Sequence, residues 1–228
     1  MIGAQLPLAV QLRDTASFET FWPGPNRELV DSLRATPVSA LLFGPSGSGR
    51  THLLQAACRA HRGRYWPLSV LADSGPDVLD GHDAPLWCLD DIDAVLSDSR
   101  WTLALLRLLD HARSEHRAVL LAASAPPDRL ALDLPDLRTR LSALPAYGLR
   151  ALTDEDRQEL LQRRAQAKGL ELGDDVVRWL LNTQPRGTGP LLDALDALDR
   201  AALSAKRRLT LPFVQSVLAP AGARKAPG

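Results

Sequence analysis

Short apolar runs and helical apolar patterns alternate along the first two thirds of the chain. The runs have the length of buried strands, and between them apolar residues recur at helical spacing. Strands that alternate with helices favour a parallel sheet covered on both faces, so the predicted fold class is α/β, with a three-layer, five-stranded parallel sheet. Pro67 cannot donate to a strand ladder, which places the second strand at or near an edge. The five predicted strands are 38–43, 64–70, 86–89, 117–124 and 146–152.

From Thr153 onward the pattern is helical throughout. We expect Thr153 to cap a helix that carries acidic residues early and basic residues late, and that ends at Gly169. Three more helices are predicted at 174–182, 191–202 and 211–218. The expected organisation is an extended N-terminal peptide, an α/β domain, a small all-α lid and a disordered tail, at 1–14, 15–150, 151–218 and 219–228.

The first strand runs into a glycine-rich turn that resembles a phosphate loop. The frame is G-x-x-x-x-G-K-[ST], except that Arg50 stands at the position of the lysine. Backbone N–H groups of such a turn and the N-terminus of the following helix bind phosphate oxygens. The alternative is an ordinary glycine-rich turn before a helix, with no phosphate site. The strand and the helix in the right places favour a nucleotide site. Its predicted residues are Gly44, Gly47, Ser48, Gly49, Arg50, Thr51 and His52.

Arginine is longer than lysine and planar, so Arg50 can hold a phosphate without following the γ-phosphate through a transition state. Nucleotide binding is therefore better supported than fast hydrolysis. Only three of the 27 basic residues are lysines, so Arg50 also fits the general preference of this chain for arginine.

Polar side chains follow two of the later strands. Asp90 and Asp91 stand at the carboxyl end of the third strand, where open parallel sheets bind ligands. Thr51 and Asp90 are the predicted Mg²⁺ ligands, and Asp91 is the candidate for orienting an attacking water. Alone, such a pair is as often a helix cap or a loop carboxylate; with the phosphate loop it favours a site. Ser124 ends the fourth strand, where it either senses a γ-phosphate or begins a turn.

Composition adds mainly exclusions. The 27 basic and 27 acidic residues cancel, so no global charge draws the chain to nucleic acid or to a membrane. Cys58 and Cys88 fall in apolar segments and are expected to be reduced core residues, and no histidine or cysteine spacing predicts a metal site. We find no signal peptide and no apolar run of membrane-spanning length, so the expected location is cytoplasmic.

The N-terminal segment is apolar and extended. Gln5, Leu6 and Leu8 combine a polar residue with alternating apolar anchors, which is typical of a short peptide that lies in the groove of a partner; a disordered tail is the alternative from composition alone. Further on, an aromatic cluster that includes Phe21 precedes a Pro-Gly-Pro turn, after which Asn26 is expected to cap a helix. These aromatic residues either staple that helix or pack beside a nucleotide base.

The order of these features resembles AAA+ ATPases of the initiator clade, and more closely the DnaA-related proteins that inactivate the replication initiator DnaA. The resemblance covers nearly the whole chain, through "QLPLAVQL", "FWPG", "LPDL", "LTDEDR" and "RRLTLPFVQSVL". It implies a negative regulator of replication initiation that binds ADP or ATP with Mg²⁺, and whose partners are DnaA and the β subunit sliding clamp. It also implies a nucleoid association through the clamp.

The resemblance assigns further roles residue by residue. Gln5, Leu6 and Leu8 correspond to the clamp-binding peptide. Arg140 corresponds to an arginine finger that acts in trans on ATP held by DnaA, with Arg138 as the runner-up, and we expect both on the exposed side of a short helix. Asn26, Ser124 and the lid contribute to nucleotide binding, but Gly189 stands where the family has a lid arginine, and Arg186 is the nearest substitute.

Two other functions stay open at this point. One is an autonomous AAA+ ATPase, such as a helicase-loader-like remodelling factor that uses Asp91 for its own turnover. The other is an interaction module in which the nucleotide is only structural. Because the patterned sequence ends near residue 218, we expect no sequence-specific DNA-binding domain; the preference for ADP or ATP and the choice between a homodimer and a higher oligomer stay open.

Overall fold

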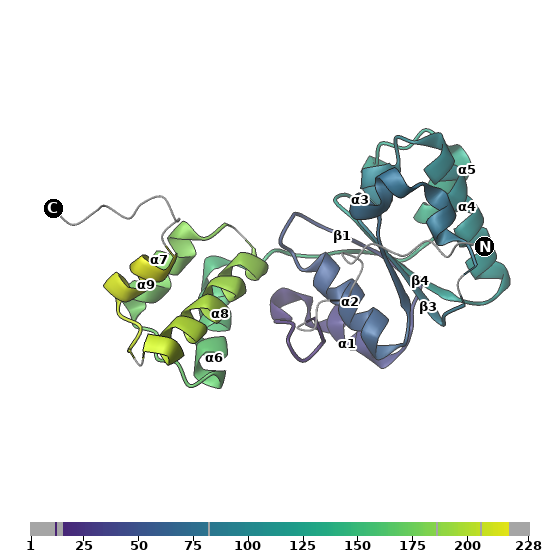
Figure 1. Cartoon of the computed structure of the whole chain (residues 1–228). Coiled ribbons are helices and arrows are strands. Elements are labelled where there is room, and N and C mark those ends of the chain that lie inside the picture. The colour runs from purple at the N-terminus through teal and green to yellow at the C-terminus, as the bar shows by residue number, and fades with distance from the viewer. Residues whose placement is uncertain (1–11, 13–15, 82, 186, 206, 219–228) are drawn as a thin grey trace. The chain divides into compact units, whose positions relative to one another are not determined.

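The computed structural model describes residues 12, 16–81, 83–185, 187–205 and 207–218. The chain divides into two compact units, Met1–Ala151 and Leu152–Gly228 (Figure 1). No helix among the described residues is long and apolar enough to cross a membrane.

The first unit contains the predicted five-stranded sheet. Every pairing between its strands is parallel, and the strand order is β2-β3-β4-β1-β5. The edge position predicted for the second strand is confirmed, since β2 pairs with β3 alone. The strands are β1 (Ala40–Phe43), β2 (Arg64–Pro67), β3 (Leu86–Asp90), β4 (Ala118–Ala123) and β5 (Ala146–Gly148).

Helices cover both faces of this sheet. In Figure 1, α1 and α2 lie on one face, and α3, α4 and α5 lie on the other. These helices are α1 (Arg27–Ala35), α2 (Arg50–Ala60), α3 (Leu68–Leu71), α4 (Ser99–Ser114) and α5 (Pro135–Ser142). Single 3₁₀ turns join them at η2 (Gly24–Asn26), η3 (Ala72–Ser74), η4 (Pro76–Leu79), η5 (Ile92–Val95) and η6 (Pro127–Arg129).

Two hydrophobic cores, one on each face, hold these layers together. Successive strand residues point to opposite faces, so Leu41 packs in the core under α4 while Leu42 packs in the core under α2. In β3, Trp87 and Cys88 divide in the same way. Cys58 and Cys88 are both buried with free thiols, as predicted. The three-layer α/β fold is confirmed.

The register brings the carboxyl ends of neighbouring strands to one edge of the sheet. Phe43 pairs with Ala123, and Leu89 pairs with Leu121. The segments after β1, β3 and β4 therefore begin close together. These segments carry the phosphate loop, the two aspartates and Ser124.

The second unit is the predicted four-helix unit. Thr153 forms a full capping box with Asp156 at its start, and Gly169, at φ +70, ends the first helix. Its core consists mainly of leucine, valine and alanine side chains from all four helices. The helices are α6 (Asp154–Ala167), α7 (Asp174–Thr183), α8 (Thr188–Ala205) and α9 (Leu211–Leu218).

One predicted cap is wrong. Asn26 is the residue before α1, but its side chain makes no cap hydrogen bond. Its amide instead pairs with the backbone of Arg150: Nδ2 donates to the Arg150 carbonyl at 3.1 Å, and the Arg150 N–H donates to Oδ1 at 3.0 Å. A local cap would satisfy one N–H group, whereas this contact fixes the chain as it leaves β5.

Candidate nucleotide-binding site

The phosphate loop joins the carboxyl end of β1 to the first turn of α2. A Cβ at Gly44 would lie 2.7 Å from the carbonyl oxygen of Leu149, so a larger residue cannot fit there. Gly49 has φ +98, and a Cβ there would lie 2.6 Å from the Phe21 ring. The first N–H groups of a helix have no partner within the helix, so this turn presents donors to an anion.

Two polar atoms of the loop fit a phosphate group. Ser48 Oγ and Arg50 Nη1 are both buried, and neither has a hydrogen-bond partner within the described part of the chain. Leaving such a group unsatisfied costs about 1–3 kcal/mol. Phosphate oxygens at this turn would accept from both atoms. The arginine at position 50 is therefore compatible with nucleotide binding.

Asp90 lies at the centre of a buried polar network below the loop. Only 1% of the residue is exposed. Tyr65 donates its hydroxyl proton to Oδ2 at 2.8 Å, the Asp91 N–H donates to Oδ1 at 3.1 Å, and Thr51 hydrogen-bonds the same carboxylate. Gln55 in turn hydrogen-bonds the Tyr65 hydroxyl. The predicted magnesium ligands Thr51 and Asp90 are thus brought together.

Burial governs the protonation of this network. Burial raises the pKa of the Asp90 carboxyl, and the nearby Asp91 charge acts in the same direction, while hydrogen bonds from Thr51 and Tyr65 oppose the rise. Burial, followed by the Asp90 charge, also raises the pKa of Tyr65. A divalent cation at Thr51 and Asp90 would stabilise the carboxylate and reverse this effect. Hydroxyl and carboxylate oxygens are the protein ligands that Mg²⁺ uses beside nucleotide phosphates.

Asp91 takes a backbone conformation that is uncommon outside glycine. Its φ is +52, and Ser69 of α3 donates to Oδ2 at 2.9 Å. Aspartate tolerates the left-handed region better than most residues, and such outliers are enriched at functional sites. Its role in orienting a water stays a prediction. At the end of β4, the Ser124 N–H donates to Asp93 Oδ1 at 3.1 Å, and Ser124 is exposed.

The segment before α1 braces the phosphate loop. His52 Nε2 lies 2.9 Å from the Ser17 carbonyl oxygen and 3.2 Å from Thr20 Oγ1, and its ring packs 5.3 Å from that of Phe21. Phe21 in turn contacts Gly49. His52 therefore links this segment to α2. That His52 also contacts a bound nucleotide stays a prediction. The sequence singled out the aromatic cluster but gave no signal for this contact.

Arg140 and Arg138 differ more than the sequence suggested. Arg140 Nε donates to Asp110 Oδ1 on α4 at 2.6 Å, and its side chain is 40% exposed. Arg138 is half-buried, and its guanidinium donates to the carbonyl oxygens of Leu132 and Pro127. Both arginines are partly exposed, and they differ in their partners, because the turn before α5 takes the donors of Arg138.

Some predicted residues fall outside the described ranges. These are the clamp-peptide residues Gln5, Leu6 and Leu8, the lid residue Arg186 and the tail, 219–228. Gly189 lies in the first turn of α8, and a Cβ added there would meet no atom within 4 Å. In the part of the chain that the structure describes, no group of three or more histidine, cysteine, aspartate or glutamate residues could hold a metal. A metal at Thr51 and Asp90 would therefore depend on nucleotide oxygens for further ligands.

The helical unit matches a known family. Residues 154–218 match the family model described as "Hda, lid domain". This range begins with α6 and ends with α9, so it covers the whole described helical unit.

Comparison with solved structures shows that most of the chain has a fold similar to that of DnaA and of RuvB. Domain III of the replication initiation protein DnaA from Thermotoga maritima has a TM-score of 0.73 and 16% identity, over 91% of this chain and 97% of that chain. AMPPCP-bound DnaA from Aquifex aeolicus has a TM-score of 0.69 and 19% identity, over 84% and 67%. The RuvB Holliday junction branch migration motor from Thermotoga maritima has a TM-score of 0.61 and 15% identity, over 90% and 72%.

Proposed function

We propose that this chain is an Hda-type AAA+ regulator of replication initiation that holds an adenine nucleotide and promotes hydrolysis of DnaA-bound ATP. The observation that carries the proposal is the match of residues 154–218 to the Hda lid domain, on a chain with the fold of DnaA domain III. DnaA with the same fold binds the adenine nucleotide analogue AMPPCP, which supports ADP or ATP as the nucleotide of this chain.

The chain's own nucleotide lies at the phosphate loop. Ser48 and Arg50 hold phosphate oxygens, because both carry a buried polar atom without a partner in the described structure. Thr51 and Asp90 hold Mg²⁺, since their side chains already contact each other. Around them, Gly44, Gly47 and Gly49 shape the loop, and His52, Asn26 and Ser124 complete the nucleotide environment.

Arg140 acts on the nucleotide of the partner. It projects from α5 with a half-exposed guanidinium whose described partner is the single carboxylate of Asp110, also half-exposed. An ion pair of this kind is worth at most about 1 kcal/mol, so Arg140 can exchange Asp110 for phosphoryl oxygens. A guanidinium that neutralises charge on a transferring phosphoryl group accelerates hydrolysis. Arg138 is less suited, because its donors are already engaged.

The N-terminal peptide brings the two proteins together. Gln5, Leu6 and Leu8 bind the β subunit of the DNA polymerase sliding clamp, and a clamp on DNA then raises the local concentration of Arg140 near DnaA. The Gln5→Ala variant should lose retention on the clamp while binding nucleotide normally. Co-elution with the clamp at wild-type strength would contradict this assignment.

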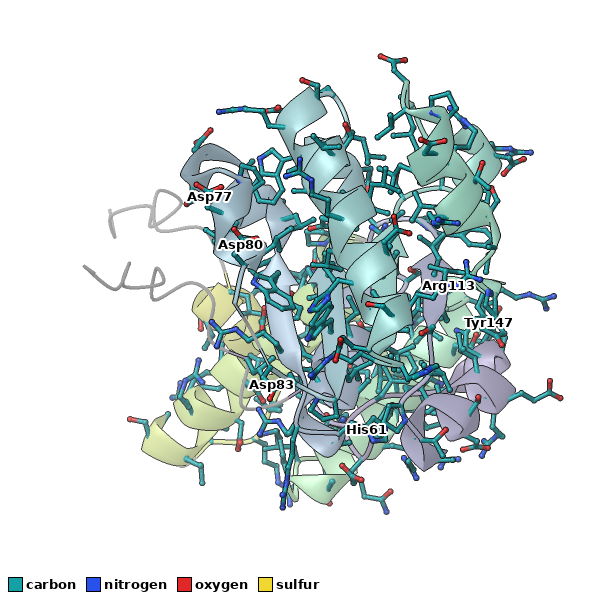
Figure 2. All side chains as sticks on the ribbon, turned by 90° about the vertical axis from the view of Figure 1, so that its right-hand side faces the viewer. His61, Asp77, Asp80, Asp83, Arg113 and Tyr147 are labelled. Carbon is teal, nitrogen blue, oxygen red and sulfur yellow. The ribbon has the colours of Figure 1, made fainter. Side chains whose placement is uncertain are left out.

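The Arg140→Ala variant tests the proposed function. Hydrolysis of DnaA-bound ATP is measured in the presence of clamp-loaded DNA, and clamp retention is measured in parallel. We expect stimulation to be abolished and clamp binding to be kept. The matched control is Arg113→Ala, which removes another exposed arginine of the same unit (Figure 2) and should change neither. Unchanged stimulation by Arg140→Ala would refute the proposal.

An autonomous ATPase, such as a helicase-loader-like factor, is the second candidate. It is favoured by the contact of Asp90 with Thr51 and by the uncommon backbone of Asp91, which together give the chain the carboxylates of an active site. This candidate predicts steady ATP turnover by the purified chain without DnaA, and its loss in Asp91→Asn. The regulator predicts weak or absent turnover by the chain alone.

A further inference from the structure

Tyr65 and Gln55 are buried polar side chains that the sequence assigns to no site. Tyr65 lies on β2 and is 7% exposed, and Gln55 lies on α2 and is 4% exposed. Burial of a hydroxyl or an amide is costly unless the group is hydrogen-bonded. The contacts that these two side chains make therefore indicate what they do.

The register of β2 and β3 places Tyr65 on the same face of the sheet as Asp90. Tyr65 is opposite Cys88, which is two residues before Asp90. Side chains two residues apart in a strand share a face, and both Tyr65 and Cys88 pack in the core under α2. The tyrosine side chain bridges this step, which is about 6.6 Å long in a strand. Its hydroxyl donates to Asp90 Oδ2 at 2.8 Å.

Helix α2 supplies the other half of the network. Thr51 and Gln55 are four residues apart in this helix, so their side chains lie on one face of it. Thr51 hydrogen-bonds the Asp90 carboxylate, and Gln55 hydrogen-bonds the Tyr65 hydroxyl. Because the hydroxyl proton goes to Asp90, the Tyr65 oxygen accepts its second hydrogen bond from the amide N–H of Gln55.

These contacts form a closed ring around the carboxylate. The ring runs from Gln55 to Tyr65, Asp90 and Thr51, and it closes through the backbone of α2. The Asp91 N–H donates to the other carboxylate oxygen, Oδ1, at 3.1 Å. Each oxygen of Asp90 thus has a donor, and rotation of the carboxylate would break these bonds. Donors of this kind orient a metal ligand before the metal arrives.

We propose that Tyr65, supported by Gln55, is a positioning residue that holds the Asp90 carboxylate in the orientation that binds Mg²⁺ beside a nucleotide. This inference rests on the nucleotide site of the proposed function, and its test needs neither DnaA nor the clamp. The competing account is packing alone, in which the phenol ring fills the core under α2 and the hydroxyl has no effect on the metal. Tyr65→Phe separates the two accounts, because it keeps the ring and removes the donor.

The test titrates Mn²⁺ into the full chain, kept in excess over ADP, and follows the bound metal by electron paramagnetic resonance. Mn²⁺ binds the same oxygen ligands as Mg²⁺. In Tyr65→Phe we expect the Kd of Mn²⁺ to rise about tenfold, while the Kd of ADP measured in EDTA keeps its wild-type value. Gln55→Met keeps a side chain of similar volume and removes a more distant donor, so the Kd of Mn²⁺ should rise about threefold.

Two further variants serve as controls. Tyr147→Phe removes the hydroxyl of the chain's other tyrosine, which is exposed on the opposite edge strand, β5 (Figure 2), and should change neither Kd. Asp90→Ala removes the carboxylate through which Tyr65 acts. Adding Tyr65→Phe to Asp90→Ala should therefore raise the Kd of Mn²⁺ by less than about twofold.

Each other outcome contradicts the inference. An unchanged Kd of Mn²⁺ in Tyr65→Phe would show that the hydroxyl does not position the ligand. The same loss in the Asp90→Ala background, or an equal loss of ADP binding in EDTA, would mean that Tyr65 acts through packing. A wild-type ADP complex that binds Mn²⁺ no better than free ADP does would overturn both the magnesium assignment and this inference. The regulator proposal would then be decided separately, by the stimulation of DnaA that depends on Arg140.

Discussion

The two candidate functional regions of the α/β unit are built in opposite ways. At the carboxyl edge of the sheet, Asp90 is 1% exposed and held by Tyr65, Thr51 and the backbone of Asp91. On α5, Arg140 is 40% exposed and held by the carboxylate of Asp110. The first region is preassembled and buried, while the second is accessible and weakly restrained.

This difference fits the different tasks proposed for the two regions. A buried network with few alternatives positions atoms around a ligand that stays in place, as a retained nucleotide does. An exposed guanidinium in a weak ion pair can change partners at little cost, as a residue that acts on another molecule must. Variants in the two regions should therefore affect different measurements, nucleotide retention for one and stimulation of DnaA for the other.

The largest expected effect follows from Arg140→Lys. Lysine keeps the positive charge but lacks the planar fork that binds two phosphoryl oxygens, so stimulation of DnaA-bound ATP hydrolysis should fall by about a hundredfold or more. The variant should bind nucleotide as the wild type does. If the Arg140→Lys variant supported stimulation close to the wild-type level, charge alone would be sufficient and the arginine-finger assignment would be wrong.

The next effect concerns the phosphate loop. Arg50→Ala removes a charged donor whose Nη1 is buried, so the Kd for Mg·ADP should rise by about 10- to 100-fold, with thermal protection by ADP reduced accordingly. Arg50→Lys should keep most of the binding, since the usual phosphate-loop residue is then present. Isothermal titration measures both. An unchanged Kd in Arg50→Ala would place the phosphates elsewhere.

A smaller effect is the pH dependence of stability at Asp90. Because burial raises the folded-state pKa of this carboxyl, the folded chain binds more protons than the unfolded chain as the pH rises above the ordinary aspartate pKa. The stabilising contribution of Asp90 is present at low pH and lost as the pH rises through the folded pKa. Asp90→Asn does not titrate, so its free energy of unfolding should improve relative to wild type from about pH 4 to pH 7.

Urea unfolding in EDTA at several pH values measures this difference. Asp128→Asn, at an exposed position, serves as the control and should show no such trend. Adding Mg²⁺ and ADP should stabilise the wild type and not Asp90→Asn. If the free energy of unfolding of Asp90→Asn fell relative to wild type as the pH rises, the sign would contradict a buried carboxyl with a raised pKa.

The smallest effect tests how weakly Arg140 is held. Asp110→Asn removes the carboxylate partner, and an exposed ion pair is worth about 0.2–1 kcal/mol. Stimulation at limiting protein should therefore rise by up to about fivefold, with a melting temperature lower by no more than about 4 °C. A loss as large as that of Arg140→Ala would contradict this account. It would mean that Asp110 orients the Arg140 guanidinium for catalysis.

The sequence predicted the scaffold because local patterns determine it. Each of the five predicted runs contains one of the parallel strands, and the capping signals around Thr153 and Gly169 set the limits of α6. Two predicted bounds are wrong: residues 68–70 lie in α3 and not in β2, and β5 ends at Gly148 and not at 152. The juxtaposition of Thr51 and Asp90 also followed, since the carboxyl ends of parallel strands share an edge. These inferences needed only period, turn chemistry and sheet geometry.

Contacts between distant segments were not predictable in this way. Asn26 carries a typical capping side chain, but its partner is 124 residues away at Arg150. Arg138 and Arg140 share one short helix, yet only the fold shows that the turn before α5 engages the first and leaves the second accessible. The bracing of Gly49 by Phe21 likewise depends on tertiary packing.

The most direct test of the central claim is to follow two nucleotide pools at once. DnaA is loaded with ATP labelled in its γ-phosphate, this chain is loaded with unlabelled nucleotide, and release of both labelled and total phosphate is followed over a single turnover on clamp-loaded DNA. We expect labelled phosphate to be released rapidly with the wild type and only at the basal rate of DnaA with Arg140→Ala. Equal release with both proteins, or phosphate that comes from the unlabelled pool alone, would contradict the account.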